Sequence, residues 1–270
     1  MEFFGLIGEK LGHSLSEVIH TRLFELLSLP AAYKLMEIPR DSLKDVGQAI
    51  RLLSFKGINV TIPYKEMIVP QMDELDETAG TLGAVNTVKN ENGKLIGCNT
   101  DVYGLKEMFA FHHIDPAGKP AVVLGSGGAA KAALQALYEL GATQLYVASR
   151  SPEGKASHLP NTSFIGYEDL GCFSGGILLN ATPVGMWPHT DASPVSEDIV
   201  SLFDAVVDTI YNPWETKLLS MARKQNKPCC IGLYMLVAQA VRAEEIFWAK
   251  TIPQGITDTI YRELFDRLSC

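Results

Sequence analysis

The sequence lacks the features that would assign it to a membrane, secreted or nucleic-acid-binding class. No apolar run approaches the roughly 18 residues of a candidate membrane span. The N-terminus has neither the basic start nor the cleavage site of a signal peptide. Lys and Arg number 23 against 31 Asp and Glu, so the net charge is −8, whereas nucleic-acid phosphates require a basic face. We therefore expect a cytoplasmic protein with no membrane or nucleic-acid partner, in which a local donor cluster can still bind a small anion.

Cysteine and histidine are too few and too scattered to indicate a metal or disulfide class. The five cysteines are odd in number and lack zinc-site spacing, so reduced thiols are the plain interpretation. His13 and His20 stand seven residues apart with no third ligand at matching spacing. We expect no metal site.

The composition present is that of a globular protein. The chain has 270 residues, 47% hydrophobic and 20% charged, enough for one large domain or two of ordinary size. No Pro/Gly/Ser-rich linker and no internal repeat is visible, so a domain change must fall within helical segments, near Asp101 and again near Tyr234. We expect a first domain of residues 1–101, completed by residues 235–270, and a second domain of residues 102–234.

Strand-like and helix-like segments alternate along the chain, which favours an α/β fold with a largely parallel sheet. Strands are predicted over residues 3–8, 33–38, 57–61, 121–124, 145–149, 177–180, 205–208 and 229–231. Helices are predicted over residues 15–27, 41–53, 127–140, 234–250 and 255–268. Residues 85–89 and 94–97 flank an Asn-Gly hairpin signal. Pro63 fits the first turn of a helix, and Ser14 or Ser16 suits the cap of the first helix.

A glycine-rich loop follows one of these strands. Gly125, Gly127 and Ala130 match G-x-G-x-x-A directly after residues 121–124 and at the head of a helix. Such glycines allow a tight turn and a close backbone approach, and the first helical amides hold a pyrophosphate. The alternative is a turn that merely packs helix on sheet. The predicted dinucleotide-binding residues are Gly125, Ser126, Gly127, Gly128, Ala129 and Ala130.

The end of the next strand bears on which dinucleotide binds. An NAD site places an acid about 20 residues on, at the end of the next strand, but here that stretch is residues 148–152 (ASRSP), with no acid until Glu153. Arg150 instead offers a planar guanidinium suited to a phosphate, and Lys155 is near enough in sequence to assist. The alternative for Arg150 is a solvated surface arginine. The pattern favours NADP.

A lysine and an aspartate upstream suggest a reduction. Hydride transfer to a ketone leaves an alkoxide that needs a proton, which a positioned lysine can give while a carboxylate orients it. Lys65 and Asp101 are the candidates, although each alone is more often a surface charge. Their neutral polar company favours a ligand with several hydroxyls, and it includes Ser14, Ser16, Thr61, Asn86, Thr87, Asn99, Thr100 and, within an apolar helix, Gln239.

At this point the motifs resemble those of the shikimate dehydrogenase family, nearly from end to end. The matching segments are residues 8–20 (with HSLS at 13–16), 59–65 (NVTIPYK), 83–87 (GAVNT), 99–101 (NTD), 125–130, 180–186 (NATPVGM), 208–213 (DTIYNP) and 232–239. The resemblance implies an N-terminal substrate domain with a mostly parallel sheet and a Rossmann-like NADP domain, with a cleft between them. It also implies reversible NADPH-dependent reduction of 3-dehydroshikimate to shikimate in aromatic amino-acid (chorismate) biosynthesis.

The resemblance also implies roles for residues. Lys65 and Asp101 become the catalytic pair. The residues that would bind the substrate's carboxylate and hydroxyls are Ser14, Ser16, Thr61, Asn86, Tyr211 and Gln239. The cofactor falls to the glycine loop, to Ser149, Arg150, Ser151 and Lys155 at the 2′-phosphate, and to Thr182, Gly232 and Met235.

The chain departs from the family pattern at five positions. Lys10 and Glu17 stand where proline is usual, and Ser149 and Ser151 stand where asparagine and threonine are usual around the phosphate arginine. Tyr234 replaces a common glycine before the methionine, which bears on closure of the nicotinamide pocket.

Two alternative functions remain beside a monomeric or homodimeric shikimate dehydrogenase. One is a quinate/shikimate dehydrogenase using NAD, and the paired serines at positions 14 and 16 favour shikimate over it. The other is a non-catalytic dinucleotide-binding sensor, which has no reason to retain Lys65, Asp101 and Gln239 together.

Overall fold

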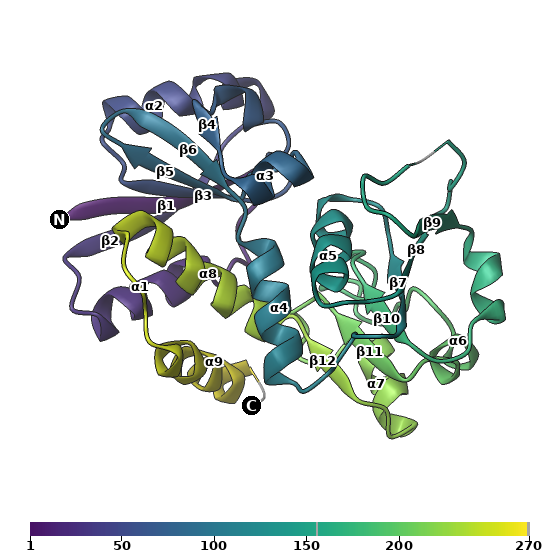
Figure 1. Cartoon of the computed structure of the whole chain (residues 1–270). Coiled ribbons are helices and arrows are strands. Elements are labelled where there is room, and N and C mark those ends of the chain that lie inside the picture. The colour runs from purple at the N-terminus through teal and green to yellow at the C-terminus, as the bar shows by residue number, and fades with distance from the viewer. Residues whose placement is uncertain (155, 269–270) are drawn as a thin grey trace. The chain divides into compact units, whose positions relative to one another are not determined.

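The computed structural model describes residues 1–154 and 156–268, and the chain divides into two compact units (Figure 1). The first comprises Met1–Asp101 and Val237–Leu264, and the second comprises Val102–Leu236 and the chain from Phe265 onward. This geometric division differs slightly from the sequence-based one, since Met235, Leu236 and the end of the last helix go with the second unit. Phe265 does so because its ring packs edge-on against Trp214, with centroids 4.3 Å apart. The predicted α/β class is confirmed.

The first unit is built on a six-stranded sheet with the order β2-β1-β3-β5-β6-β4. The strands are β1 Glu2–Gly8, β2 Ala31–Glu37, β3 Gly57–Val60, β4 Glu74–Leu75, β5 Thr87–Glu91 and β6 Lys94–Cys98. β1 is parallel to both β2 and β3, whereas β5 runs antiparallel to β3 and β6. The predicted hairpin is confirmed, with Asn92 and Gly93 both at positive φ as its turn requires.

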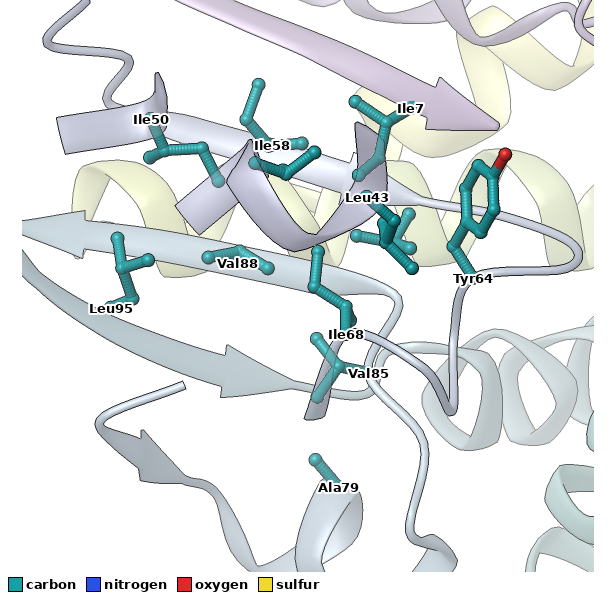
Figure 2. Close-up of a cluster of buried hydrophobic side chains, with 12 residues drawn as sticks. Ile7, Leu43, Ile50, Ile58, Tyr64, Ile68, Ala79, Val85, Val88 and Leu95 are labelled. Carbon is teal, nitrogen blue, oxygen red and sulfur yellow. The ribbon is translucent and has the colours of Figure 1, made fainter. Parts of the chain in front are cut away.

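Helices cover both faces of this sheet, so it has a core on each side. On one face lie the 3₁₀ helix η1 (Arg40–Asp45), α2 (Val46–Leu52) and α3 (Glu77–Leu82), packed on the cluster shown in Figure 2. On the other face, side chains of α1 (Ser16–Leu26) and α8 (Leu233–Trp248) pack on Phe4 and Leu6. Because strand side chains alternate, Ile58 and Val60 enter the first core and Asn59 points to the second face. α9 (Gln254–Leu268) ends the described chain.

Two local predictions in this unit are wrong. No helix starts at Pro63; residues 61–68 form turns before the 3₁₀ helix η2 (Val69–Gln71). The reason is that the fully buried Tyr64 is anchored by its hydroxyl, which donates to the carbonyl of Ile38. Neither serine caps α1 through its side chain, because Leu15 is the N-cap residue and Ser14 Oγ accepts from the amide of Ser16 instead.

The second unit is built on a six-stranded parallel sheet with the order β12-β11-β10-β7-β8-β9. The strands are β7 Pro120–Leu124, β8 Gln144–Ala148, β9 Thr162–Ile165, β10 Ile177–Asn180, β11 Ala205–Asp208 and β12 Cys229–Ile231. The helical segments are α4 Asp101–Phe111, α5 Gly128–Glu139, η3 Tyr167–Cys172, α6 Glu197–Ser201 and α7 Lys217–Lys224. The strand order reverses at β7, where ligands bind in open α/β sheets. In the described chain, no helix is long and apolar enough to cross a membrane.

Candidate active site

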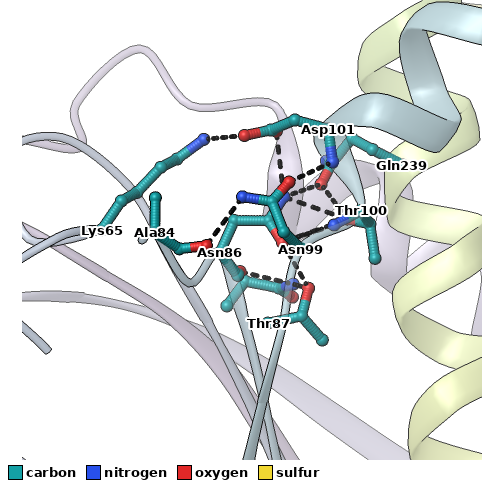
Figure 3. Close-up of polar contacts among 9 residues, drawn as sticks. Lys65, Ala84, Asn86, Thr87, Asn99, Thr100, Asp101 and Gln239 are labelled. Carbon is teal, nitrogen blue, oxygen red and sulfur yellow. Dashed lines mark hydrogen bonds and ion pairs between the residues drawn. The ribbon is translucent and has the colours of Figure 1, made fainter. Parts of the chain in front are cut away.

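The structure pairs the lysine and the aspartate that the sequence singled out. Lys65 lies in the turns that follow β3, and Asp101 is the first residue of α4. The Lys65 ammonium donates to Asp101 Oδ2 at 2.6 Å, and the two side chains are 22% and 10% exposed (Figure 3). The pair is thus mostly withdrawn from water yet open enough for a ligand to reach the ammonium.

Neutral side chains hold this carboxylate from the other side. Asn86 Nδ2 donates to Asp101 Oδ1 at 2.9 Å, while Asn86 Oδ1 accepts from the backbone amide of Thr100 at 2.8 Å (Figure 3). Asn99 Oδ1 accepts from the Asp101 amide at 3.0 Å. Gln239, on α8, accepts from Thr100 Oγ1 at 3.2 Å. The fold therefore brings Lys65, Asn86, Asp101 and Gln239 into one cluster.

The remaining predicted substrate residues do not belong to this hydrogen-bonded cluster. Ser14 and Ser16 lie just before and at the start of α1, and their hydroxyls are 3.1 Å apart. Thr61 follows β3 and is half-buried. In the described chain these side chains have no hydrogen bond to the Lys65–Asp101 cluster. Tyr211 belongs to the second unit, where burial raises the pKa of its phenol. Their contact with substrate remains a prediction.

The glycine loop of the second unit has the shape of a phosphate cradle. Gly125 has φ +101°, and a Cβ there would lie 2.9 Å from Thr182 Cγ2, so the turn requires glycine. Gly127 is the N-cap of α5 and has no side chain to cap it. A Cβ at Gly127 or Gly128 would meet nothing within 4 Å. Open space therefore lies beside these two glycines at the start of α5, where helix amides can hold the pyrophosphate of a dinucleotide.

The residues predicted for the 2′-phosphate follow β8. Ser149 is buried and accepts through Oγ from the Ser151 amide at 3.3 Å, which shapes the turn. Arg150 between them is exposed. Burial raises the pKa of Tyr167, and the positive charge of Arg150 opposes that rise. Lys155 lies outside the described residues.

The residues predicted near the nicotinamide lie at two strand ends of the second unit. Thr182 Oγ1 donates to Asn180 Oδ1 at 2.7 Å. A Cβ at Gly232 would stand 2.2 Å from the carbonyl oxygen of Thr209, so this close backbone approach admits only glycine. Met235 is half-buried in the first turn of α8. Beside it, Tyr234 is buried and stacks on Phe111, with ring centroids 4.0 Å apart.

Sequence reasoning missed a second buried carboxylate. Asp208, at the end of β11, accepts through Oδ1 from Asn180 Nδ2 at 3.0 Å and through Oδ2 from Thr216 Oγ1 at 2.8 Å. Burial raises its pKa to about 6. The available signal was a polar residue ending an apolar strand. The same kind of signal, a polar residue inside an apolar strand, marks Asn59 in β3.

Comparisons with known proteins find relatives that are similar to the chain in sequence and in fold. A family model described as the shikimate dehydrogenase substrate binding domain matches residues 6–88. A shikimate dehydrogenase (NADP(+)) of Clostridium beijerinckii is 43% identical over 262 residues, which cover 97% of each chain. The crystal structure of shikimate dehydrogenase 1 from Peptoclostridium difficile has a TM-score of 0.94 at 46% identity and covers 99% of both chains. Shikimate 5-dehydrogenase from Thermus thermophilus, in complex with NADP(H) and shikimate, has a TM-score of 0.85 at 30% identity and covers 97% of this chain and 99% of its own.

Proposed function

The chain belongs to the shikimate dehydrogenase family, and from that premise we propose that it catalyses the reversible NADPH-dependent reduction of 3-dehydroshikimate to shikimate. The observation that carries the proposal within this chain is the ion pair of Lys65 and Asp101 in a polar cluster. Shikimate is an intermediate of aromatic amino-acid (chorismate) biosynthesis, so we place the enzyme in that pathway.

Lys65 handles the proton of the proposed reaction. When bound, NADPH supplies the hydride that adds to the carbonyl carbon. The Lys65 ammonium donates a proton to the carbonyl oxygen as that oxygen gains negative charge, so the ketone becomes an alcohol. Asp101 holds the ammonium in place from one side only, which leaves its other N–H bonds to the substrate. In the reverse direction the amine takes the proton back.

We assign the other ligand contacts by motif position and local geometry. Ser14 and Ser16 hold the substrate's carboxylate, and Thr61, Asn86, Tyr211 and Gln239 hold its hydroxyls. The amides of residues 125–130 hold the pyrophosphate, and Arg150 binds the 2′-phosphate with help from Ser149, Ser151 and Lys155. Thr182, Gly232 and Met235 line the nicotinamide site. On this assignment the first unit supplies every substrate contact except Tyr211, and the second unit binds NADP. We propose a cytoplasmic enzyme that is a monomer or a homodimer.

A four-way steady-state assay tests this function. The purified chain oxidises shikimate or quinate with NADP or NAD, and the appearance of reduced nicotinamide is followed by absorbance. We expect by far the highest kcat/KM for shikimate with NADP. Comparable values for shikimate and quinate would favour a quinate/shikimate dehydrogenase. NADP binding without turnover of either acid would instead leave a dinucleotide-binding sensor.

A further inference from the structure

A row of three buried polar side chains crosses the face of the first sheet that packs on α1 and α8. Tyr33 on β2, Asn59 on β3 and Thr87 on β5 are 6%, 5% and 0% exposed. Phe4 and Leu6 on the intervening β1 belong to the apolar cluster of this face. Tyr33 Oη donates to Asn59 Oδ1 at 2.8 Å, and Asn59 Nδ2 donates to Thr87 Oγ1 at 3.2 Å.

The row continues without a break into the Lys65–Asp101 pair. Thr87 Oγ1 donates to Asn86 Oδ1 at 3.0 Å, and Asn86 Nδ2 donates to Asp101 Oδ1 at 2.9 Å (Figure 3). The other oxygen of Asp101 receives Lys65. Every link therefore belongs to the first unit, and the chain of hydrogen bonds spans from β2 to the start of α4.

Backbone groups fix the direction of every hydrogen bond in the series from Tyr33 to Asp101. The Thr100 amide can only donate, so the atom of Asn86 that it reaches at 2.8 Å is the oxygen, and the nitrogen of Asn86 must face Asp101. The Asn86 carbonyl can only accept, so the atom of Asn59 that lies 3.3 Å from it is the nitrogen. The hydroxyl of Thr87 must then donate to Asn86 and accept from Asn59. All donors thus run toward Asp101.

The far end of the chain is held as a donor. Burial raises the pKa of Tyr33 well above its ordinary value, with the charge of Glu244 adding to the effect, so the phenol keeps its proton. The ring of His20 stacks on that of Tyr33 with centroids 4.0 Å apart and an interplanar angle of 10°. His20 is itself held by Glu244 at 2.6 Å.

We propose that Tyr33, Asn59 and Thr87 are positioning residues that lock the Asn86 amide in one orientation and thereby aim Asp101 at the Lys65 ammonium. The inference rests on the proposed dehydrogenase function and extends it to three residues to which we assign no ligand contact. A reversed Asn86 amide would turn its oxygen toward the carboxylate, and the two acceptors would repel. Once the Thr87 hydroxyl is lost, only the Thr100 amide still donates to Asn86 Oδ1 at 2.8 Å from the backbone, with Gln239 Oε1 accepting from Asn86 Nδ2 at 3.5 Å, so fewer contacts oppose that reversal.

The first test removes and then restores the central hydroxyl. Thr87→Val keeps the shape of the side chain but ends the donation to Asn86. We expect kcat for shikimate oxidation to fall about tenfold, equivalent to about 1.4 kcal/mol, with KM for shikimate and for NADP changed less than threefold. Thr87→Ser restores the hydroxyl and should recover kcat to within about twofold of wild type. The matched control is Thr257→Val, the same change at a buried threonine of α9 in the same unit, which should leave kcat unchanged.

A second variant guards against simple misfolding. Tyr33→Phe removes only the outermost donor, three hydrogen bonds away from the Asn86 side chain, so we expect a smaller fall in kcat, about threefold. Thermal unfolding of each variant shows whether the fold survives. An unchanged kcat in a folded Thr87→Val would overturn the proposal, as would a loss that Thr87→Ser fails to restore or that Thr257→Val matches. If the wild-type protein did not oxidise shikimate with NADP, the proposed function itself would be contradicted. The two failures are therefore distinguishable.

Discussion

Each unit of the chain buries an aspartate carboxylate beside an asparagine, and the two carboxylates differ in the charge of their hydrogen-bond partners. Asp101 in the first unit meets the neutral Asn86 on one oxygen and the cationic Lys65 on the other. Asp208 in the second unit meets Asn180, Thr216 and the amide of Ile210, so its described hydrogen-bond partners are all neutral. Of the two aspartates, Asp208 is the more deeply buried, since the whole residue is 0% exposed against 7% for the whole of Asp101.

The difference separates a chemical role from a structural one. A carboxylate that orients an ammonium near the surface lies where a proton can pass to a ligand. A carboxylate enclosed by neutral donors ties elements together, here the ends of β10 and β11 to the start of α7, where Thr216 is the N-cap residue. Its burial has a cost, because desolvation disfavours the charged form.

The largest expected effect comes from breaking the ion pair of the first unit. Lys65→Ala should lower kcat by about 10²–10⁴-fold, the usual contribution of a general acid–base group, and leave KM for shikimate within a few-fold. Steady-state kinetics in the oxidative direction measures both constants. Lys94→Ala, at an exposed lysine that pairs with Glu74, should change neither. A loss below about tenfold, or an effect on KM alone, would remove Lys65 from the proton-transfer role.

The next effect concerns stability against pH and tests the carboxylate of the second unit. The pKa of folded Asp208 is about 6, above the ordinary 3.8. The unfolded chain therefore releases this proton at lower pH, and the contribution of Asp208 to stability is full below about pH 4 and is lost as pH rises through about 6. At about 1.36 kcal/mol for each pKa unit, the loss is about 3 kcal/mol.

Urea unfolding of wild type and Asp208→Asn from pH 4 to pH 7 measures this contribution as the difference between the two chains. The wild type should lose stability relative to Asp208→Asn across that range. Asp73 offers a control of opposite sign, because the Leu95 amide and then Arg51 lower its pKa, so its contribution is lost as pH falls. A pH-independent difference for Asp208→Asn would contradict the structural interpretation.

A third prediction concerns Arg150 of the second unit. This arginine is exposed, and it is not among the hydrogen-bond partners of Asp208. Arg150→Ala should weaken NADPH about ten- to a hundredfold and barely affect NADH, since charge-assisted hydrogen bonds contribute about 1.5–3 kcal/mol each. KM for both cofactors is the measurement. Arg223→Ala, at another arginine of the same unit that pairs with Glu215, should alter neither value. Equal losses for both cofactors would mean that Arg150 supports the turn and does not read the phosphate.

The smallest expected effect concerns the glycine loop of the second unit, whose shape depends on the backbone and not on side chains. Gly125→Ala places a Cβ at φ +101° and 2.9 Å from Thr182, whereas Gly118→Ala has φ +74° with no atom within 4 Å. Both incur the left-handed backbone cost of about 1–2 kcal/mol. Only the first adds a close contact, so we expect a lower melting temperature for Gly125→Ala than for Gly118→Ala. Equal melting temperatures would show that the turn at Gly125 relaxes at no cost.

Much of the fold was predictable because its signals are local. Buried parallel strands such as β7 and β11 are mostly continuous apolar runs. The six residues of the glycine loop are enough to predict its turn. Two strands were not predicted because they lack such a local signal. β4 has two residues, and β9 is a partly exposed edge strand with the sequence TSFI. The confirmed family came from the resemblance of whole motifs, and the confirmed NADP preference was already indicated by Arg150 and the missing acid after β8.

The site was less predictable because its contacts are distant in sequence. Lys65 and Asp101 are 36 residues apart, and only the sheet brings them together. Tyr33 reaches Asn59 across β1, which requires the strand order, and no spacing rule supplies that order. Pro63 misled because its preference for a first helical turn was overridden by the burial of Tyr64. Local chemistry thus indicated which residues matter, and tertiary pairing determined what they do.

The return of α8 to the first sheet sets an order of events during synthesis. Phe4 packs on Phe247, and His20 pairs with Glu244, 224 positions later in the chain. Between them the ribosome must make the whole of the second sheet. At about 5–20 residues per second, the apolar face around Phe4 and Leu6 waits on the order of ten seconds for its cover. We expect the nascent chain to be a chaperone client during that interval, since the N-terminal half of this protein is translated first and completed last.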